Sequence, residues 1–96
     1  MAVQQSDALL GPEGLNRLVW RCRRGMLEND LFIDRFFRRH GETLTVGQAQ
    51  CLTELMALSD NDLLDLHLGR KSPAQIDTQL DRPEIIALLG LLQVNR

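Results

Sequence analysis

The sequence has no long hydrophobic run and no recognisable targeting segment. None of its apolar stretches approaches the roughly 20 residues that a membrane-spanning helix needs, so we expect no direct membrane insertion. The first ten residues, MAVQQSDALL, contain neither a basic segment nor the apolar stretch of a signal peptide, and Asp7 argues against a transit peptide. These absences predict a cytoplasmic protein and favour a bacterial source.

The sequence also lacks the patterns that carry chemistry. Its two cysteines, Cys22 and Cys51, and its two histidines, His40 and His67, show no zinc-ligand spacing. Both cysteines fit apolar positions of a helical pattern, so we expect buried thiols in a reducing compartment. Both histidines are interpreted as capping residues, because each lies at or near the end of a predicted helix. A protonated imidazole interacts favourably with the helix dipole there. With no nucleophile beside a base, no paired acids and no phosphate-binding glycine loop, we expect no catalytic residue, no metal and no stably bound cofactor.

An excess of positive charge is missing as well. The net charge is −2, so bulk electrostatics do not point to nucleic acid. A small DNA-binding helix-turn-helix protein is nevertheless the competing interpretation, because the chain contains the basic segments RCRRG and RFFRRH. Against it, Glu28, Asp30 and Asp34 lie in the same stretch and would meet phosphates unfavourably.

What the sequence contains is enough for one small domain. Its 96 residues, of which 44% are hydrophobic, can form a single core. Apolar residues recur at helical spacing, and no strand-length run alternates with period two. We therefore predict an all-α, compact single-domain bundle of about five short helices over residues 12–96, preceded by a flexible N-terminal arm over residues 1–11.

Start and stop signals place these helices. The sequence Thr45-Val46-Gly47-Gln48 matches the capping box, and Ser59 is a second expected N-cap. The residues after Gly69 are interpreted as a loop, and Asp81 is expected to cap the last helix ahead of Pro83. The expected helices cover residues 12–23, 26–39, a third from 45, a fourth after 59 and a last one ending near 94.

The stretch from residue 20 to residue 40 concentrates charge at a bend. Gly25 separates two runs of helical periodicity and therefore predicts a break between helices. Across that break, Arg24 and Glu28 are four residues apart and can pair if the second helix begins by Arg24.

Three apolar residues in this stretch lie off the predicted core stripes. Trp20 is either a packing residue at the edge of the core or part of a partner surface, where tryptophan is common. Leu27 and Leu31 are either covered by another helix or form an exposed contact surface beside Arg24 and Glu28.

The same stretch carries a family resemblance. Arg24-Gly25-Met26-Leu27-Glu28 matches the pattern RGxxE, preceded by a tryptophan and an RCRR run and followed by a Phe-Phe pair. With the later segment LMALSDNDLLDLHLGRKSP, the chain resembles the succinate dehydrogenase flavinylation-factor family over residues 14–94.

The resemblance implies an assembly factor rather than an enzyme. Members of this family bind the flavoprotein subunit of succinate dehydrogenase, and in some bacteria that of fumarate reductase, and promote covalent attachment of FAD within that client. FAD is thus the cofactor of the client. The family has also been described as antitoxin-like partners of a membrane toxin, which is an alternative role. The resemblance places the client-binding residues at Arg24, Gly25 and Glu28, with flanking contacts at Trp20, Arg23, Leu27 and Asp30.

Overall fold

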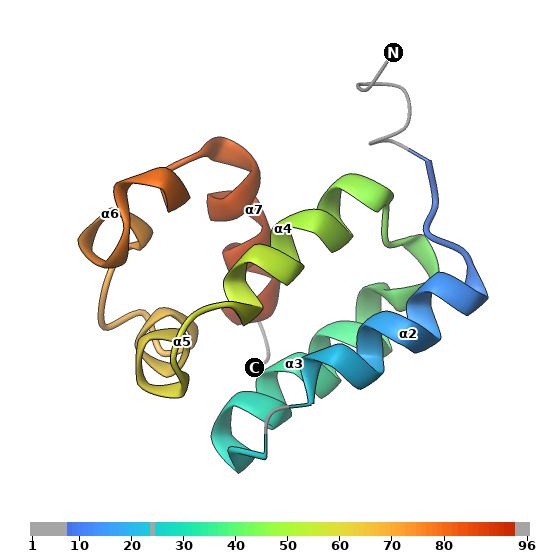
Figure 1. The fold of residues 1–96 in the computed structure, drawn as a ribbon, viewed down its shortest axis with the longest axis horizontal. Helices are drawn as coiled ribbons and strands as arrows, with labels where there is room; N and C mark the ends of the chain where they lie inside the picture. The colour runs from blue at the N-terminus through green and yellow to red at the C-terminus, as the bar shows by residue number, and fades with distance from the viewer. Residues whose placement is uncertain (1–7, 24, 94–96) are drawn as a thin grey trace.

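Helices account for the fold of the described part of the chain (Figure 1). The computed structural model describes residues 8–23 and 25–93. Its elements are α2 (Pro12–Cys22), α3 (Leu27–His40), the 3₁₀ turn η1 (Gly41–Thr43), α4 (Val46–Met56), α5 (Asp60–His67), α6 (Pro73–Ile76), the 3₁₀ turn η2 (Thr78–Leu80) and α7 (Pro83–Gln93). These residues form no strand beyond one isolated bridge, between Leu9 and Thr45. The predicted all-α class is confirmed.

Side-chain caps explain where two of the helices begin. At α4 the Gln48 backbone N–H donates to Thr45 Oγ1 at 3.1 Å, and the Thr45 N–H donates to Gln48 Oε1 at 3.0 Å. At α5 the Asp62 N–H donates to Ser59 Oγ at 3.2 Å. Each bond satisfies a backbone donor that the helix itself leaves without an acceptor. Both predicted N-caps are therefore confirmed.

Two expectations about the C-terminal half are wrong. The segment after Gly69 is not entirely a loop, because Ser72-Pro73 starts the short helix α6, with the Ser72 N–H bonded to Gln75 Oε1 at 2.7 Å. Proline suits a first helical position, a signal that the loop interpretation overlooked. Asp81 is also not the residue before α7, since the Arg82 carbonyl accepts the bond from the Ile86 N–H at 3.0 Å.

The segment that leads into α2 is paired with the start of α4. The Leu10 N–H donates to the Leu44 carbonyl, and the Val46 N–H donates to the Ala8 carbonyl, both at 2.8 Å. These residues are the C-terminal part of the arm expected over residues 1–11, and residues 1–7 lie outside the described part. The pairing fixes where α2 begins relative to α4.

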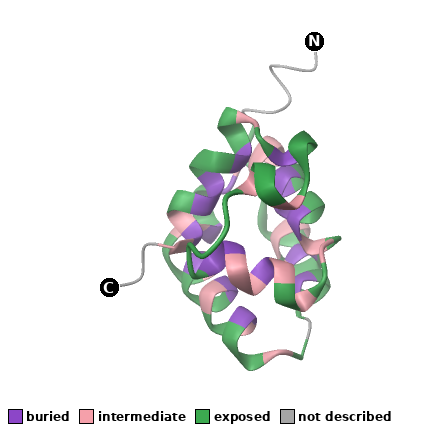
Figure 2. Cartoon of the chain, turned by 90° about the vertical axis from the view of Figure 1, so that its left-hand side faces the viewer, coloured by how far each residue is buried: buried purple, intermediate pink, exposed green. Residues whose placement is uncertain are grey.

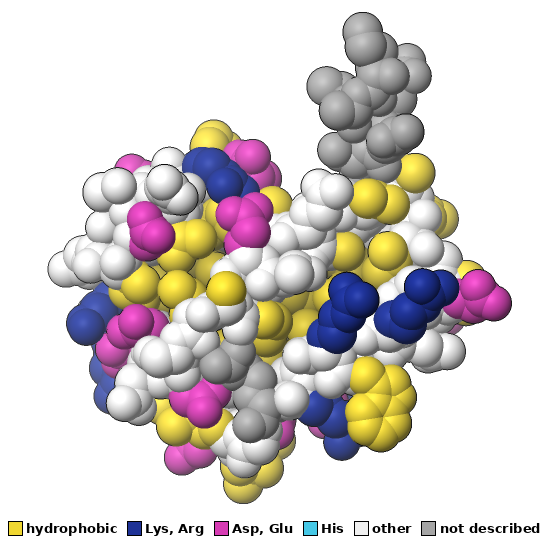
Figure 3. Space-filling view, viewed as in Figure 1, with side chains coloured by type: hydrophobic (Ala, Val, Ile, Leu, Met, Phe, Trp, Pro, Cys, Tyr) yellow, Lys and Arg dark blue, Asp and Glu magenta, His cyan; other side chains and the backbone are white. Residues whose placement is uncertain are grey.

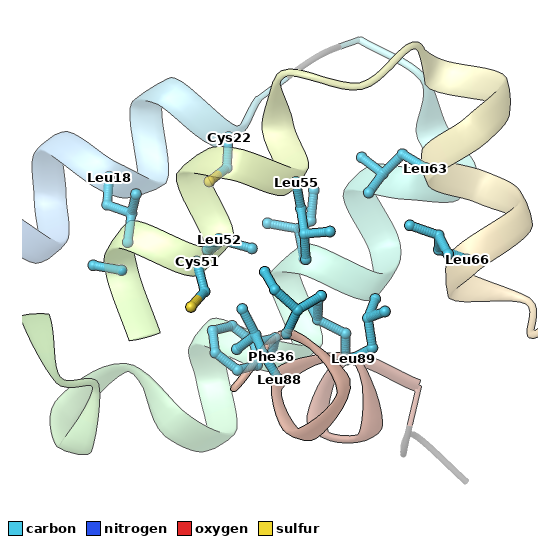
Figure 4. Close-up of a cluster of buried hydrophobic side chains, with 14 of the residues drawn as sticks. Leu18, Cys22, Phe36, Cys51, Leu52, Leu55, Leu63, Leu66, Leu88 and Leu89 are labelled. Atoms are coloured by element: carbon cyan, nitrogen blue, oxygen red, sulfur yellow. The ribbon is translucent and has the colours of Figure 1, made fainter. Parts of the chain in front are cut away.

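The core gathers around α3, which contacts α2, α5 and α7 (Figures 1 and 2). Ile33 and Phe36 are its buried apolar residues, whereas its other two phenylalanines, Phe32 and Phe37, are only partly buried. Figure 4 shows part of the cluster, in which side chains from α2, α3, α4, α5 and α7 meet. Its buried members are Leu18, Cys22, Ile33, Phe36, Leu44, Ala49, Cys51, Leu52, Leu55, Leu63, Leu66, Leu80, Ile85, Leu88, Leu89 and Leu92. Both cysteines are thus buried, as predicted.

The helices are predicted to contain no membrane-spanning segment. Each helix in the described residues is too short or too polar to span a bilayer.

The core predicts how two leucine substitutions differ. Leu55 has no exposed surface, whereas Leu68 is 50% exposed. Leu55→Ala removes buried methyl groups and leaves a cavity, so it should lower the free energy of unfolding by about 2–5 kcal/mol. Leu68→Ala is the matched control and should change it by no more than about 0.5 kcal/mol. Urea titration followed by circular dichroism measures both, and equal losses would contradict this core.

Candidate functional site

The chain bends between α2 and α3 as the sequence predicts. α2 ends at Cys22, and Arg23 follows in an extended conformation with φ −76° and ψ 116°. Gly25 has φ +91°, Met26 is again extended, and α3 begins at Leu27. Arg24 lies outside the described residues, so its pairing with Glu28 stays a prediction.

Gly25 is required by its backbone rather than by crowding. Its φ of +91° is in the region that side-chain-bearing residues rarely adopt. A Cβ placed there would meet no other atom of the described chain within 4 Å. The position therefore needs glycine for its conformation, and its open side leaves room for another molecule to approach the backbone closely.

Large apolar side chains are exposed on both sides of the bend. Trp20, in the last turn of α2, is 76% exposed, and Leu27, the first residue of α3, is 69% exposed. Leu31 is 44% exposed, one turn beyond Leu27 on the same side of α3. The interpretations that bury Trp20 at the core edge and cover the two leucines with a helix are therefore wrong. All three side chains are exposed. That they form a partner surface stays a prediction.

Charged residues surround these apolar groups. The Arg23 guanidinium carbon lies 5.7 Å from the centre of the Trp20 ring, within cation–π range. Glu28 and Asp30 lie in the first turn of α3, where carboxylates interact favourably with the helix dipole. Glu28 is exposed and Asp30 partly buried. The bend thus combines exposed apolar surface with both signs of charge.

The pockets near the bend do not bring together all of the predicted site residues that the structure describes. A recess at the bend is lined by Arg23, Asp30, Asp34 and neighbouring apolar side chains. Its volume of about 40 Å³ is far below that of a cofactor site. A groove of about 580 Å³ lies between α2 and α4 and is lined in part by Arg17 and Arg21. Figure 3 shows basic side chains beside hydrophobic ones on one face of the molecule. Of the predicted site residues that the structure describes, none lines that groove. In the residues that the structure describes, the bend is therefore an exposed surface with only a small recess.

A buried polar pair that the sequence analysis missed lies beneath this surface. Asn29, the residue after Glu28, has no exposed surface, and His67 is 2% exposed. The Asn29 Oδ1 and His67 Nδ1 atoms are 3.0 Å apart. The Asn29 amide nitrogen donates to the Asp60 carbonyl at 3.0 Å and to the Met26 sulfur at 3.3 Å.

The capping role expected of His67 is wrong. The imidazole points into the core and stacks on Phe32, with ring centres 4.9 Å apart. Burial disfavours the charged imidazolium and lowers the pKa of His67 from 6.5 to about 4. A sequence signal for the burial of Asn29 does exist, because Asn29 shares the spacing of Ile33 and Phe36 and so interrupts an apolar stripe with an amide.

Comparison with protein families gives a match over most of the chain. The family model described as flavinator of succinate dehydrogenase matches residues 16–89. These residues include the whole bend and most of the described helices.

Curated relatives agree with that match. The FAD assembly factor SdhE of Ralstonia nicotianae is 45% identical over 89 residues, which are 93% of this chain and 86% of that protein. The FAD assembly factor SdhE of Legionella pneumophila is 36% identical over 58 residues, covering 60% of this chain and 73% of that protein. That of Coxiella burnetii is 34% identical over 62 residues, covering 65% and 76%. No solved structure is similar enough to count as a match.

The buried imidazole predicts a pH dependence of stability. The pKa of His67 is about 4 in the folded chain and about 6.5 when exposed, so the unfolded chain binds more protons between these values. The free energy of unfolding should be fully present above about pH 6.5 and should fall with acidification, at up to about 1.4 kcal/mol per pH unit. Urea titrations between about pH 7 and pH 5 measure the slope.

The control for this slope is His67→Asn, which cannot titrate. The pKa of Glu54 is lowered by its hydrogen bond with Arg82, so Glu54 begins to lose its own contribution only below its ordinary value of 4.5. The range above about pH 5 therefore isolates His67. A wild-type slope equal to that of His67→Asn would contradict the buried, neutral imidazole.

Proposed function

The chain belongs to the family of flavinators of succinate dehydrogenase, and we propose that it does this work by docking the bend between α2 and α3 onto the flavoprotein subunit. It is an assembly factor that promotes covalent attachment of FAD to that subunit. The observation that carries the docking surface is the exposure of Trp20 and Leu27 on the two sides of Gly25.

The surface has the composition of a protein-binding site. Tryptophan and arginine are enriched among the residues that dominate binding energy, and Arg23 here lies over the Trp20 ring. The exposed leucines of α3 supply apolar area that water disfavours, and Glu28 and Asp30 supply charge for specificity. Arg24, which lies outside the described residues, adds a planar cation able to bond a carboxylate with two donors.

Docking assists flavinylation by shifting the client toward one conformation. A protein that binds one conformation of its partner more tightly raises the population of that conformation by the difference in affinity. The bond between FAD and the client then forms within the client, so this chain supplies no catalytic residue. FAD stays the cofactor of the client, and this chain holds it at most transiently.

The range of partners follows from the same surface. We include the flavoprotein subunit of fumarate reductase as a second client, which the family resemblance implies. We expect no sequence-specific binding to nucleic acid, since Glu28 and Asp30 flank the basic residues of the bend. The protein works in the bacterial cytoplasm, where the client acquires its flavin.

Glycine substitutions test the docking surface with a matched control. Gly25 and Gly69 have φ values of +91° and +73°, and a Cβ at either would meet nothing within 4 Å. Alanine at either position should lower the free energy of unfolding by a similar amount, about 1–2 kcal/mol, because both force a side-chain-bearing residue into a left-handed backbone. Only Gly25→Ala should also lower covalent flavin on the client, because its new methyl group stands at the docking surface.

The measurement is in-gel flavin fluorescence of the succinate dehydrogenase flavoprotein subunit in cells that lack the endogenous factor and express each variant. Circular dichroism melting of the purified variants shows whether the two stability losses match. Glu28→Ala extends the test, since an exposed side chain should affect flavinylation without changing the melt. Normal flavinylation by folded Gly25→Ala and Glu28→Ala would reject the proposed surface.

A further inference from the structure

The side chain next to the docking surface is anchored to both ends of another helix. Asn29 follows Glu28 in α3, but its side chain points inward and has no exposed surface. It contacts the carbonyl of Asp60, the first residue of α5, and the imidazole of His67, the last residue of α5. One side chain thus ties the first turn of α3 to the whole length of α5.

The chemistry of the three groups fixes their orientation. The Asp60 carbonyl can only accept a hydrogen bond, so the Asn29 atom 3.0 Å from it must be the amide nitrogen. Asn29 Oδ1 then faces His67, and as an acceptor it requires a proton on the imidazole Nδ1, 3.0 Å away. The neutral imidazole therefore carries its proton on Nδ1. Stacking on Phe32 holds the ring in this position.

Rotation of α3 would break this arrangement. A turn about the helix axis, or a shift along it, would separate Asn29 from Asp60 and His67 and leave buried polar groups without partners. Apolar contacts at Ile33 and Phe36 tolerate small rotations more readily, because dispersion attraction has no preferred direction.

We propose that Asn29 is a positioning residue for the docking surface, oriented by His67, and that it fixes how the first turn of α3 presents Glu28 and Leu27 to the client. The inference rests on the proposed function, because it assumes that this turn meets the flavoprotein subunit. Its benefit is preorganisation: a turn held in its bound orientation has less freedom to lose on docking.

Two substitutions of His67 separate positioning from packing. His67→Phe keeps a ring that can stack on Phe32 but has no N–H to donate to Asn29. His67→Asn removes the ring but places an amide nitrogen two bonds beyond Cβ, where Nδ1 stands, so it can donate to Asn29 Oδ1. A packing role predicts that Phe is tolerated better than Asn, because Asn leaves a cavity. The positioning role predicts the opposite order in client binding.

The measurement is the dissociation constant for the purified flavoprotein subunit of succinate dehydrogenase without covalent flavin, by titration calorimetry with the full chain. His67→Phe should weaken binding about tenfold or more, the loss expected for one unmade hydrogen bond. His67→Asn should stay within about threefold of wild type. Leu80→Ala controls for lost stability, since Leu80 is buried in η2, outside α3 and α5, and should bind as wild type when folded.

The affinities of the variants for the flavoprotein subunit distinguish a positioning role from a packing role. If His67→Phe binds as tightly as His67→Asn or wild type, the positioning role is rejected. If His67→Phe does not fold, Asn29→Asp replaces it, because the carboxylate keeps the size of the side chain but has no donor for the Asp60 carbonyl. Wild-type affinity in folded Asn29→Asp would equally reject the role.

Glu28→Ala distinguishes this inference from the proposed function. Weak binding by Glu28→Ala together with normal binding by the His67 variants rejects the positioning role alone. Normal binding by Glu28→Ala rejects the docking surface, and the positioning role with it. Long-range ¹H–¹⁵N spectra of the imidazole give an independent reading, since the proton should be on Nδ1 in wild type, and a proton on Nε2 would contradict the hydrogen-bond order.

Discussion

Burial of one face of α3 is the constraint on which the rest of the structure depends. Asn29, Ile33 and Phe36 recur at the spacing of one helical face, and all three are buried. Leu27 and Leu31 then lie on the opposite face, because each is two positions from Asn29, and two positions correspond to roughly half a turn of the helix. Burial of the core face of α3 therefore determines that Leu27 and Leu31 remain exposed to solvent. The exposed apolar surface at the bend is a consequence of how α3 is buried.

The glycine break makes this arrangement possible. α2 and α3 contact each other along the chain reversal, which needs an abrupt change of direction between Cys22 and Leu27. The left-handed backbone of Gly25 supplies that change without a side chain. Trp20 is thereby left at the solvent-facing end of α2, with Arg23 over its ring. The residues that shape this bend in the fold are thus also those of the proposed docking surface.

Much of the fold could be predicted from the sequence because the signals are local. The capping box at Thr45 and the serine cap at Ser59 depend on residues three positions away, and both predictions hold. The helix at Pro73 was overlooked because its serine and proline lie in a short polar segment that also fits a loop. His67 was misplaced for a different reason. Its partner Asn29 is 38 positions away, and no local pattern reports a contact of that kind.

Some features of the candidate site could likewise be predicted from the sequence, and others could not. The bend, the position of Gly25 and the carboxylates of the first turn of α3 follow from spacing, whereas the exposure of Trp20 and Leu27 depends on which helices pack together. A sequence with apolar residues on both faces of a helix leaves two choices for its core, and only tertiary packing selects one. In this chain the polar pair of Asn29 and His67 adds a directional preference to that selection.

The most direct test of the account is amide hydrogen exchange of the full chain, alone and in complex with the flavoprotein subunit of succinate dehydrogenase. The account predicts that protection gained in the complex is concentrated in peptides covering the end of α2 and the first turn of α3, including Trp20 and Leu27, while α6 and η2 exchange as in the free chain. Protection concentrated on α6 and η2, with the bend unchanged, would contradict it.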